Sequence, residues 1–289
     1  MIPAPPRAGS VLSLGPGGFH RIAFTDWGEQ QPRKATVCVH GLTRNGRDFD
    51  VLADALSSHG RVVCPDVAGR GASDWLSNPK DYIYPTYMND MATLMAHIGA
   101  ERVDWVGTSM GGLIGMMLAA TPGTPIRRLV INDIGPLIPK EALVRIGNYV
   151  GGAPGFADID AAERYLRDVH APFGDLSDEE WRHLATNSTV QDGAGGLRLH
   201  YDPTIADAFT AGPVEDVDLW AVWDRIECPV LVLRGAESDL LSKDTAAEMA
   251  KRGPRAEIVE IAGCGHAPAL MDSEQVATVL NWLTKSAQA

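Results

Sequence analysis

The feature that most constrains this chain is a serine flanked by glycines, Gly-Thr-Ser-Met-Gly at residues 107–111. Val103–Val106 predicts a buried strand before it, and Leu113–Ala120 predicts a helix after it. A strand that turns at once into a helix leaves no room for side chains two positions from the central residue, which explains both glycines. The turn would expose the Ser109 hydroxyl at a helix N-terminus, where developing negative charge is favoured. Ser109 is therefore the candidate nucleophile.

A serine hydroxyl needs a base near pH 7, and His266 is the best placed of the 8 histidines. It follows the last expected strand, and its small neighbours leave the imidazole free to project over the sheet edge. The base in turn needs an acid to orient it, and we expect this to be Asp239, which follows the strand expected at 229–234. The chain order Ser, Asp, His favours this choice. Glu237, in the same loop, and Asp133, at the end of the preceding strand, are the alternatives.

Acyl transfer also requires two backbone N–H groups that point at the developing oxyanion. One should belong to Met110, directly after the nucleophile. The other should come from the loop that follows the strand at 35–40, and we assign it to Leu42. His40, which begins this loop, is expected to make structural hydrogen bonds and not to act as the base. The chain has no phosphate-binding loop, dinucleotide fingerprint or paired His/Cys spacing, so no cofactor and no metal is expected.

The charge balance argues against several classes of partner. The chain carries 25 Lys and Arg against 37 Asp and Glu, a net charge of −12, and such a surface repels nucleic acid and anionic membranes. The 4 cysteines form no C-x-x-C pair, the first ten residues do not resemble a signal peptide, and the longest apolar stretch is too short to span a bilayer. We therefore expect a cytoplasmic protein that acts on a small molecule.

Short β-branched runs alternate with helical periods, which predicts a mostly parallel sheet flanked by helices. The expected strands are 20–27, 35–40, 61–65, 103–107, 127–133, 229–234 and 256–261. From residue 135 to about residue 223 only short helical segments are predicted, separated by Gly and Pro breaks. The domain prediction is a core of residues 1–134 and 218–289 with a helical cap at 135–217. Two aromatic residues of this cap, Phe156 and Trp181, are expected to influence which chain lengths the site accepts.

Together these segments resemble the α/β-hydrolase fold family of serine hydrolases, and within it the bacterial carboxylesterases with a helical cap. The matching residues are His40-Gly41, Asp66, Gly69, Gly71, Ser73, Gly107, Ser109, Gly111, Asp239 and Gly265-His266. The resemblance implies hydrolysis of a small-molecule carboxylic ester by two-step acyl transfer, with no cofactor.

Two other functions remain alternatives. The carbon–carbon hydrolases that act on ring-cleavage products typically carry Asn before the nucleophile, a glycine-richer oxyanion loop and Trp after the histidine. This chain has Thr108, Leu42-Thr43-Arg44 and Ala267 at those places, which favours ester substrates. A non-catalytic small-molecule receptor of the same fold would keep the same residues, and cofactor-free perhydrolases share the triad.

Overall fold

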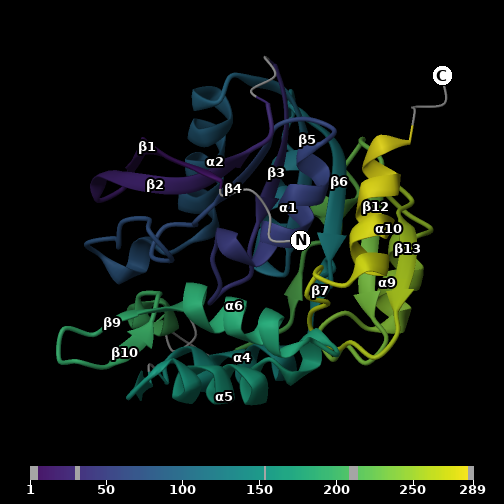
Figure 1. Ribbon diagram of the computed structural model, residues 1–289. Helices are drawn as coiled ribbons and strands as arrows, with labels where there is room; N and C mark the ends of the chain where they lie inside the picture. Colours follow the sequence, from purple (N-terminus) through teal and green to yellow (C-terminus); the bar gives the residue numbers. More distant parts are fainter. Residues whose placement is uncertain (1–5, 30–32, 153, 208–213, 286–289) are drawn as a thin grey trace.

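An eight-stranded sheet forms the centre of the computed structural model, which describes residues 6–29, 33–152, 154–207 and 214–285 (Figure 1). In chain order its strands are β1 (Arg7–Gly15), β2 (Gly18–Trp27), β3 (Arg33–Val39), β4 (Val62–Pro65), β5 (Ala100–Thr108), β6 (Ile126–Asn132), β12 (Val230–Gly235) and β13 (Glu257–Ile261). Their order across the sheet is β1-β2-β4-β3-β5-β6-β12-β13. The β1–β2 and β2–β4 pairs are antiparallel and the others are parallel, which confirms the predicted sheet.

The prediction missed β1, the edge strand that pairs with β2 in a hairpin. The apolar side chains of this strand face outward, since Leu12 and Leu14 are 62% and 59% exposed, whereas Ser13 between them is buried. A strand is identified in a sequence by apolar residues that alternate on the buried face, whereas here the leucines are exposed and the serine between them is buried.

Helices cover both faces of the sheet because the strands carry apolar side chains on both sides. On one face, α1 (Asp50–Ser57) and α10 (Ser273–Thr284) pack over Cys38, Val106 and Val130. The other face is covered by α2 (Tyr84–His97), α3 (Met110–Ala119), α8 (Trp220–Trp223) and α9 (Lys243–Met249). Two short 3₁₀ helices, Gly46–Phe49 and Pro79–Asp81, lie in loops of this core. No helix within the described ranges is both long and apolar enough to cross a bilayer.

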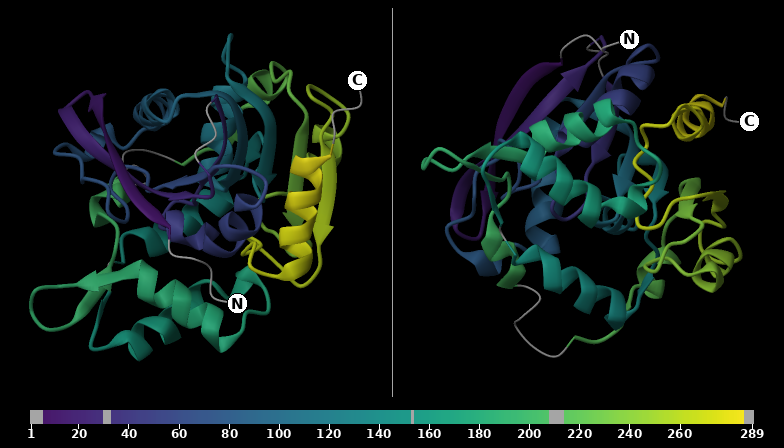
Figure 2. Two further views of the ribbon diagram at one scale, coloured as in Figure 1. Left: turned by 45° about the horizontal axis from the view of Figure 1, so that its top comes forward. Right: turned by 60° about the horizontal axis from the view of Figure 1, so that its bottom comes forward.

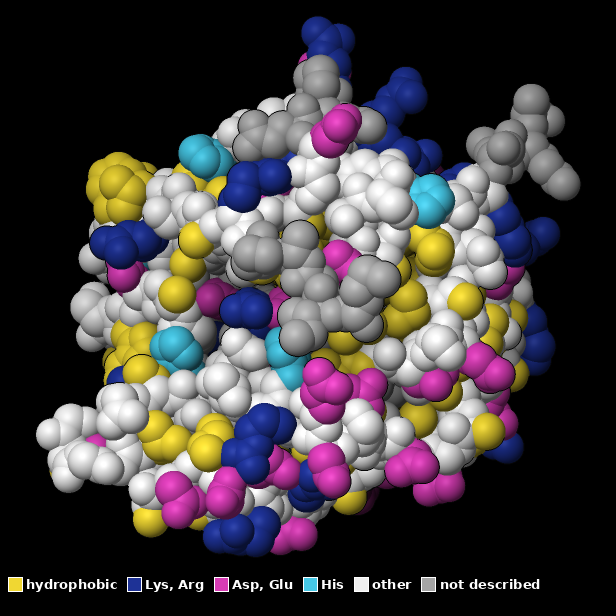
Figure 3. Space-filling view, in the orientation of Figure 1, with side chains coloured by type: hydrophobic (Ala, Val, Ile, Leu, Met, Phe, Trp, Pro, Cys, Tyr) yellow, Lys and Arg dark blue, Asp and Glu magenta, His cyan; other side chains and the backbone are white. Residues whose placement is uncertain are grey.

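Residues 135–217, between β6 and α8, extend away from the sheet, and their described part includes the helices α4 (Lys140–Val150), α5 (Ile159–Val169) and α6 (Asp178–Ser188). Figure 1 shows them below the ends to which the parallel strands point, and the right-hand view of Figure 2 shows them in front of the sheet. Short 3₁₀ helices lie at Ala171–Phe173 and Pro203–Ala206. Figure 3 shows acidic and basic side chains interspersed on the outer surface of this region.

The inserted segment also contains short strands that the sequence did not predict. A three-stranded sheet joins β8 (Gly155–Phe156), β10 (Leu197–Leu199) and β9 (Thr189–Gln191), and β7 (Leu137–Ile138) pairs with β11 (Val217–Asp218). These strands have two or three residues each, too few for an alternation pattern to be recognised. Because β7 and β11 pair antiparallel, the two ends of the segment lie side by side where it leaves the core.

Candidate functional site

Ser109 lies in the sharp turn that the sequence predicts between β5 and α3. Its backbone has a φ of 51°, a conformation that L-residues rarely adopt. Ser109 is the residue directly before α3 (Met110–Ala119), so its hydroxyl lies at the N-terminus of this helix. A Cβ on Gly107 would lie 2.3 Å from the Gly111 backbone, and a Cβ on Gly111 would lie 2.0 Å from the Val39 carbonyl oxygen. Both glycines are therefore required by close backbone packing, as predicted.

A continuous line of hydrogen bonds connects three side chains that the sheet brings together. The His266 Nε2 atom lies 2.9 Å from the Ser109 Oγ, and its Nδ1 lies 2.8 Å from an oxygen of the Asp133 carboxylate. His266 follows β13, whereas Ser109 and Asp133 follow the neighbouring strands β5 and β6. The predicted pairing of Ser109 with His266 is thus present in the structure.

Asp239, the acid predicted from chain order, is not the carboxylate beside His266, so this prediction is wrong. Its carboxylate is 54% exposed and pairs with Arg145 of α4, with Nε 2.6 Å from Oδ2 and Nη2 3.0 Å from Oδ1. The reason lies in the turn after β12, which directs Ser238 inward and its neighbour Asp239 outward to solvent. The alternative Glu237 is exposed as well. Asp133, the other alternative, occupies the place beside the histidine.

The surroundings of Asp133 suit a buried carboxylate. It is fully buried and accepts hydrogen bonds from the Gly235 amide (2.7 Å), the Ser238 hydroxyl (2.6 Å) and His266. A buried carboxylate requires hydrogen-bond donors, because transfer of an unpaired charge from water to the protein interior raises the free energy by roughly several kcal/mol. The end of β12 and the loop after it thus contribute two hydrogen-bond donors to the Asp133 carboxylate.

His40 is a structural residue at the start of the loop beside the nucleophile. The Val67 amide donates a hydrogen bond to Nε2 (2.9 Å), so the proton must be on Nδ1, which lies 2.7 Å from the Gly41 carbonyl oxygen. Burial is the main cause that lowers the pKa of His40 to about 4, and the positive charges of Arg70 and Arg44 act in the same direction. The imidazole is therefore neutral at pH 7 and links two loops, as expected from the sequence.

This lowered pKa predicts a pH-dependent contribution to stability. Protonation of His40 is disfavoured in the folded state, so its contribution is present above pH 6.5 and is lost as the pH falls through about 4. The loss amounts to about 3 kcal/mol. In urea unfolding, the stability difference between the wild type and His40→Gln is expected to shrink between pH 7 and pH 4. An equal pH dependence of both proteins would contradict this, and the exposed His59→Gln is the control.

Of the predicted oxyanion residues, Met110 directly follows Ser109, and Leu42 lies in a loop whose neighbouring residue Gly41 is close to Ser109. Met110 is the first residue of α3, whose N-terminal amides have no partner within the helix. The Leu42 loop passes close to Ser109, because a Cβ on Gly41 would lie 3.7 Å from the Ser109 Cβ. The carbonyl oxygen of Leu42 is not free: it accepts a hydrogen bond from the Arg70 Nε at 2.8 Å.

The inserted segment contacts the loop that carries His266. The Gly265 amide donates to the Pro172 carbonyl oxygen (2.8 Å), and the His170 ring stacks on Phe173 with centroids 4.5 Å apart. Burial lowers the pKa of His170 well below its usual value, and the charges of Arg44 and His266 lower it further. The segment therefore brings a second, uncharged imidazole near the first, which the sequence analysis did not identify because no motif surrounds it.

Two aromatic residues predicted to influence substrate length are instead buried within the inserted segment. Trp181 is 5% exposed and lies under the Arg167 guanidinium, 5.6 Å from the ring centroid. Phe156 is 8% exposed and packs against Tyr165. Their principal contacts are therefore those of core residues.

Comparisons with known proteins show the family and the fold of the chain. Residues 36–279 match the alpha/beta hydrolase family. The chain is 46% identical to the 3-hydroxybutyrate-oligomer hydrolase of Cupriavidus necator, over 97% of this chain and 99% of that protein. It is 29% identical to the 2-(acetamidomethylene)succinate hydrolase of Mesorhizobium japonicum, over 78% of this chain and 79% of that protein. The solved structure of an alpha/beta hydrolase from Novosphingobium aromaticivorans superposes with a TM-score of 0.88 at 36% identity, covering 98% of this chain and 99% of that one.

Proposed function

Because the chain belongs to the alpha/beta hydrolase family, we propose that it is a serine esterase with Ser109 as nucleophile, His266 as base and Asp133 as acid. The observation that carries the proposal is the continuous hydrogen-bonded line Ser109–His266–Asp133, with distances of 2.9 and 2.8 Å. A nucleophile, a base within hydrogen-bond reach and a group that orients the base are the parts that acyl transfer needs.

In the proposed mechanism, the Ser109 oxygen attacks the ester carbonyl carbon while its proton passes to His266 Nε2. Collapse of the tetrahedral intermediate breaks the bond to the leaving alcohol, which receives that proton. A water molecule then attacks the acyl-enzyme and gives one proton to the same nitrogen. Collapse of the second tetrahedral intermediate breaks the bond to the Ser109 oxygen, which takes this proton back, and the carboxylic acid product is released. Asp133 fixes the proton on Nδ1 and stabilises the imidazolium in both steps.

The developing oxyanion would be stabilised by the amides of Leu42 and Met110. Met110 directly follows Ser109 and its amide is at the positive end of α3, and Gly41, which precedes Leu42, lies close to Ser109. A donor in such a place stabilises the transition state more than the substrate, because the negative charge forms only during the reaction.

We further propose that residues 135–217 form a cap over this site. The hydrogen bond from Gly265 to Pro172 supports this, since it connects the segment directly to the loop of the base. The pairing of β7 with β11 near both proposed boundaries gives the segment a narrow attachment to the core.

The substrate that we propose is a short oligomer of 3-hydroxybutyrate, an ester of a small hydroxy acid. The 46% identity to the Cupriavidus necator oligomer hydrolase, over almost the whole length of both chains, supports this choice. The more distant relative, a 2-(acetamidomethylene)succinate hydrolase, makes 2-(acetamidomethylene)succinate the competing candidate substrate.

A substrate panel tests the proposal. The purified protein is given the 3-hydroxybutyrate dimer and trimer, p-nitrophenyl esters of graded chain length, 2-(acetamidomethylene)succinate and a ring-cleavage dienoate. We expect turnover of the dimer and trimer with kcat/KM above that of the other compounds. A preference for the succinate or the dienoate would instead select the competing chemistry. Binding without turnover of any compound would favour the receptor function.

A further inference from the structure

Arg70 is a fully buried arginine that takes no part in the proposed proton transfers. It lies in the loop that follows β4, and its side chain is 0% exposed. Within the described residues it forms no ion pair with a carboxylate. Arg44, nearby and also buried, differs in this respect, because two of its nitrogens bind the Asp48 carboxylate.

Two contacts of Arg70 involve residues of the proposed site at Ser109. Its Nε donates to the Leu42 carbonyl oxygen at 2.8 Å, and its Nη2 lies 3.7 Å from the Met110 sulfur. Leu42 and Met110 are the two residues proposed to stabilise the oxyanion. One guanidinium therefore contacts both residues of the proposed oxyanion hole, Leu42 through its carbonyl oxygen and Met110 through its side-chain sulfur.

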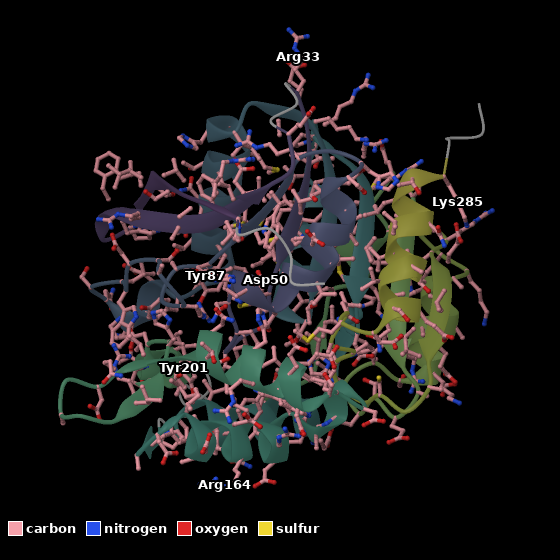
Figure 4. All side chains as sticks on the ribbon, in the orientation of Figure 1. Arg33, Asp50, Tyr87, Arg164, Tyr201 and Lys285 are labelled. Carbon is pink, nitrogen blue, oxygen red and sulfur yellow. The ribbon has the colours of Figure 1, made fainter. Side chains whose placement is uncertain are left out.

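The remaining atoms of the guanidinium are fixed by the core. Its Nη1 donates to the Ala68 carbonyl oxygen at 2.7 Å and to the Tyr87 hydroxyl at 2.9 Å. The planar group also lies over the rings of Tyr87 and Tyr82, 5.2 and 5.7 Å from their centroids. Figure 4 shows Tyr87 at the edge of the core that faces the inserted segment. Hydrogen bonds and rings on several sides leave the guanidinium little freedom to move.

Burial of a guanidinium without a carboxylate is expensive, because the ion loses its hydration and gains only neutral partners. An apolar side chain of similar length would fill the same space without that cost. A positive charge on Arg70 would have a purpose if it stabilised the oxyanion, which is present only during the reaction.

We propose that Arg70 is a positioning residue for the oxyanion hole, which fixes the Leu42 loop and Met110 behind the reacting carbonyl. The inference rests on the proposed esterase function. Arg70 is too deeply buried to touch the substrate, so it acts through these two residues. Its positive charge also adds to the field that favours a negative oxygen in front of them.

Two variants separate position from charge. Arg70→Met removes both, whereas Arg70→Lys keeps a charge but cannot reach the Leu42, Ala68 and Tyr87 oxygens together, because an ammonium lacks the planar fork. We expect kcat on the 3-hydroxybutyrate dimer to fall about 100-fold or more in Arg70→Met, and by a smaller factor in Arg70→Lys. KM is expected to stay within about threefold, because a transition-state contact lowers kcat and kcat/KM together.

Inhibitor binding supplies a readout that a merely structural role would not move. A trifluoromethyl ketone forms a tetrahedral adduct with serine, so its affinity should fall by the same factor as kcat/KM. The affinity for the uncleaved 3-hydroxybutyrate dimer, measured in a Ser109→Ala background, should change much less, because the carbonyl oxygen of an intact ester carries no full negative charge. The control is Arg61→Met, which removes a partly buried arginine that donates to Asp26 and to the Ile98 carbonyl oxygen. It should lower stability and leave kcat unchanged.

Several outcomes would overturn the proposal. Unchanged kcat in a folded Arg70 variant, or a rise in KM alone, would show that Arg70 does not act on the transition state. If neither variant folds, Tyr87→Phe removes one hydrogen bond to the guanidinium, and a kcat equal to wild type would count against the proposal. Absence of ester turnover by the wild-type protein would instead contradict the proposed function itself.

Discussion

Replacement of Ser109 by alanine is expected to lower kcat/KM for an ester substrate by about 10⁵-fold or more, because the members of a triad act as a unit. The fold should be preserved, since alanine removes one oxygen from a position whose backbone is fixed by the amide of Ser109 and the carbonyl oxygen of Asn132. Steady-state kinetics on the 3-hydroxybutyrate dimer, with a melting curve as the control for folding, measures the effect.

Covalent labelling gives an independent check on the same residue. A fluorophosphonate should modify the wild-type peptide that contains Ser109 and leave Ser109→Ala unlabelled. Ser57→Ala, which removes a hydroxyl on α1 that binds only the Asp54 carbonyl oxygen, should retain both activity and labelling. Ester turnover by Ser109→Ala close to that of the wild type would exclude the proposed nucleophile.

The second large effect is expected at Asp133. Asp133→Asn should lower kcat/KM by about 10⁴-fold, as the equivalent change does in chymotrypsin-type proteases, because an amide neither stabilises the imidazolium nor fixes the correct tautomer. Asp239→Asn should change kcat/KM by less than about threefold, since its carboxylate is 54% exposed and pairs with Arg145. Loss of that surface ion pair costs about 0–1 kcal/mol.

The two aspartates control for each other, because the substitution is the same and only the surroundings differ. Kinetics on one substrate and urea unfolding of all three proteins separate catalysis from stability. A large loss of activity in Asp239→Asn together with near-normal activity in Asp133→Asn would show that the acid comes from the loop after β12.

The proximity of Ser109 and His266 could be predicted from the sequence because local rules determine both turns. Two glycines and an abrupt change from strand to helical pattern identify the turn at Ser109, and small neighbours identify the loop of His266. The acid could not be chosen in this way, because its place depends on strand order. Thr108 and Asn132 are paired residues on β5 and β6, so Ser109 and Asp133 leave the sheet side by side. Chain order contains no information about that adjacency.

Arg70 illustrates a second limit. In the sequence it stands in a Gly-rich loop and looks like a solvated turn residue, because arginine is rarely found fully buried. Only the folded chain brings it against Leu42 and Met110, which are 28 and 40 positions away. The inserted segment shows the same limit for strands, since β8, β9 and β10 become a sheet only when all three meet.

The outward direction of Asp239 has a consequence for protein engineering. The loop after β12 must keep Gly235 and Ser238, which support the acid, but the ion pair between Asp239 and Arg145 joins the core to α4 outside the path of proton transfer. Libraries that randomise these two positions together would therefore tune how tightly α4 docks on the core, while Ser109, His266 and Asp133 stay unchanged.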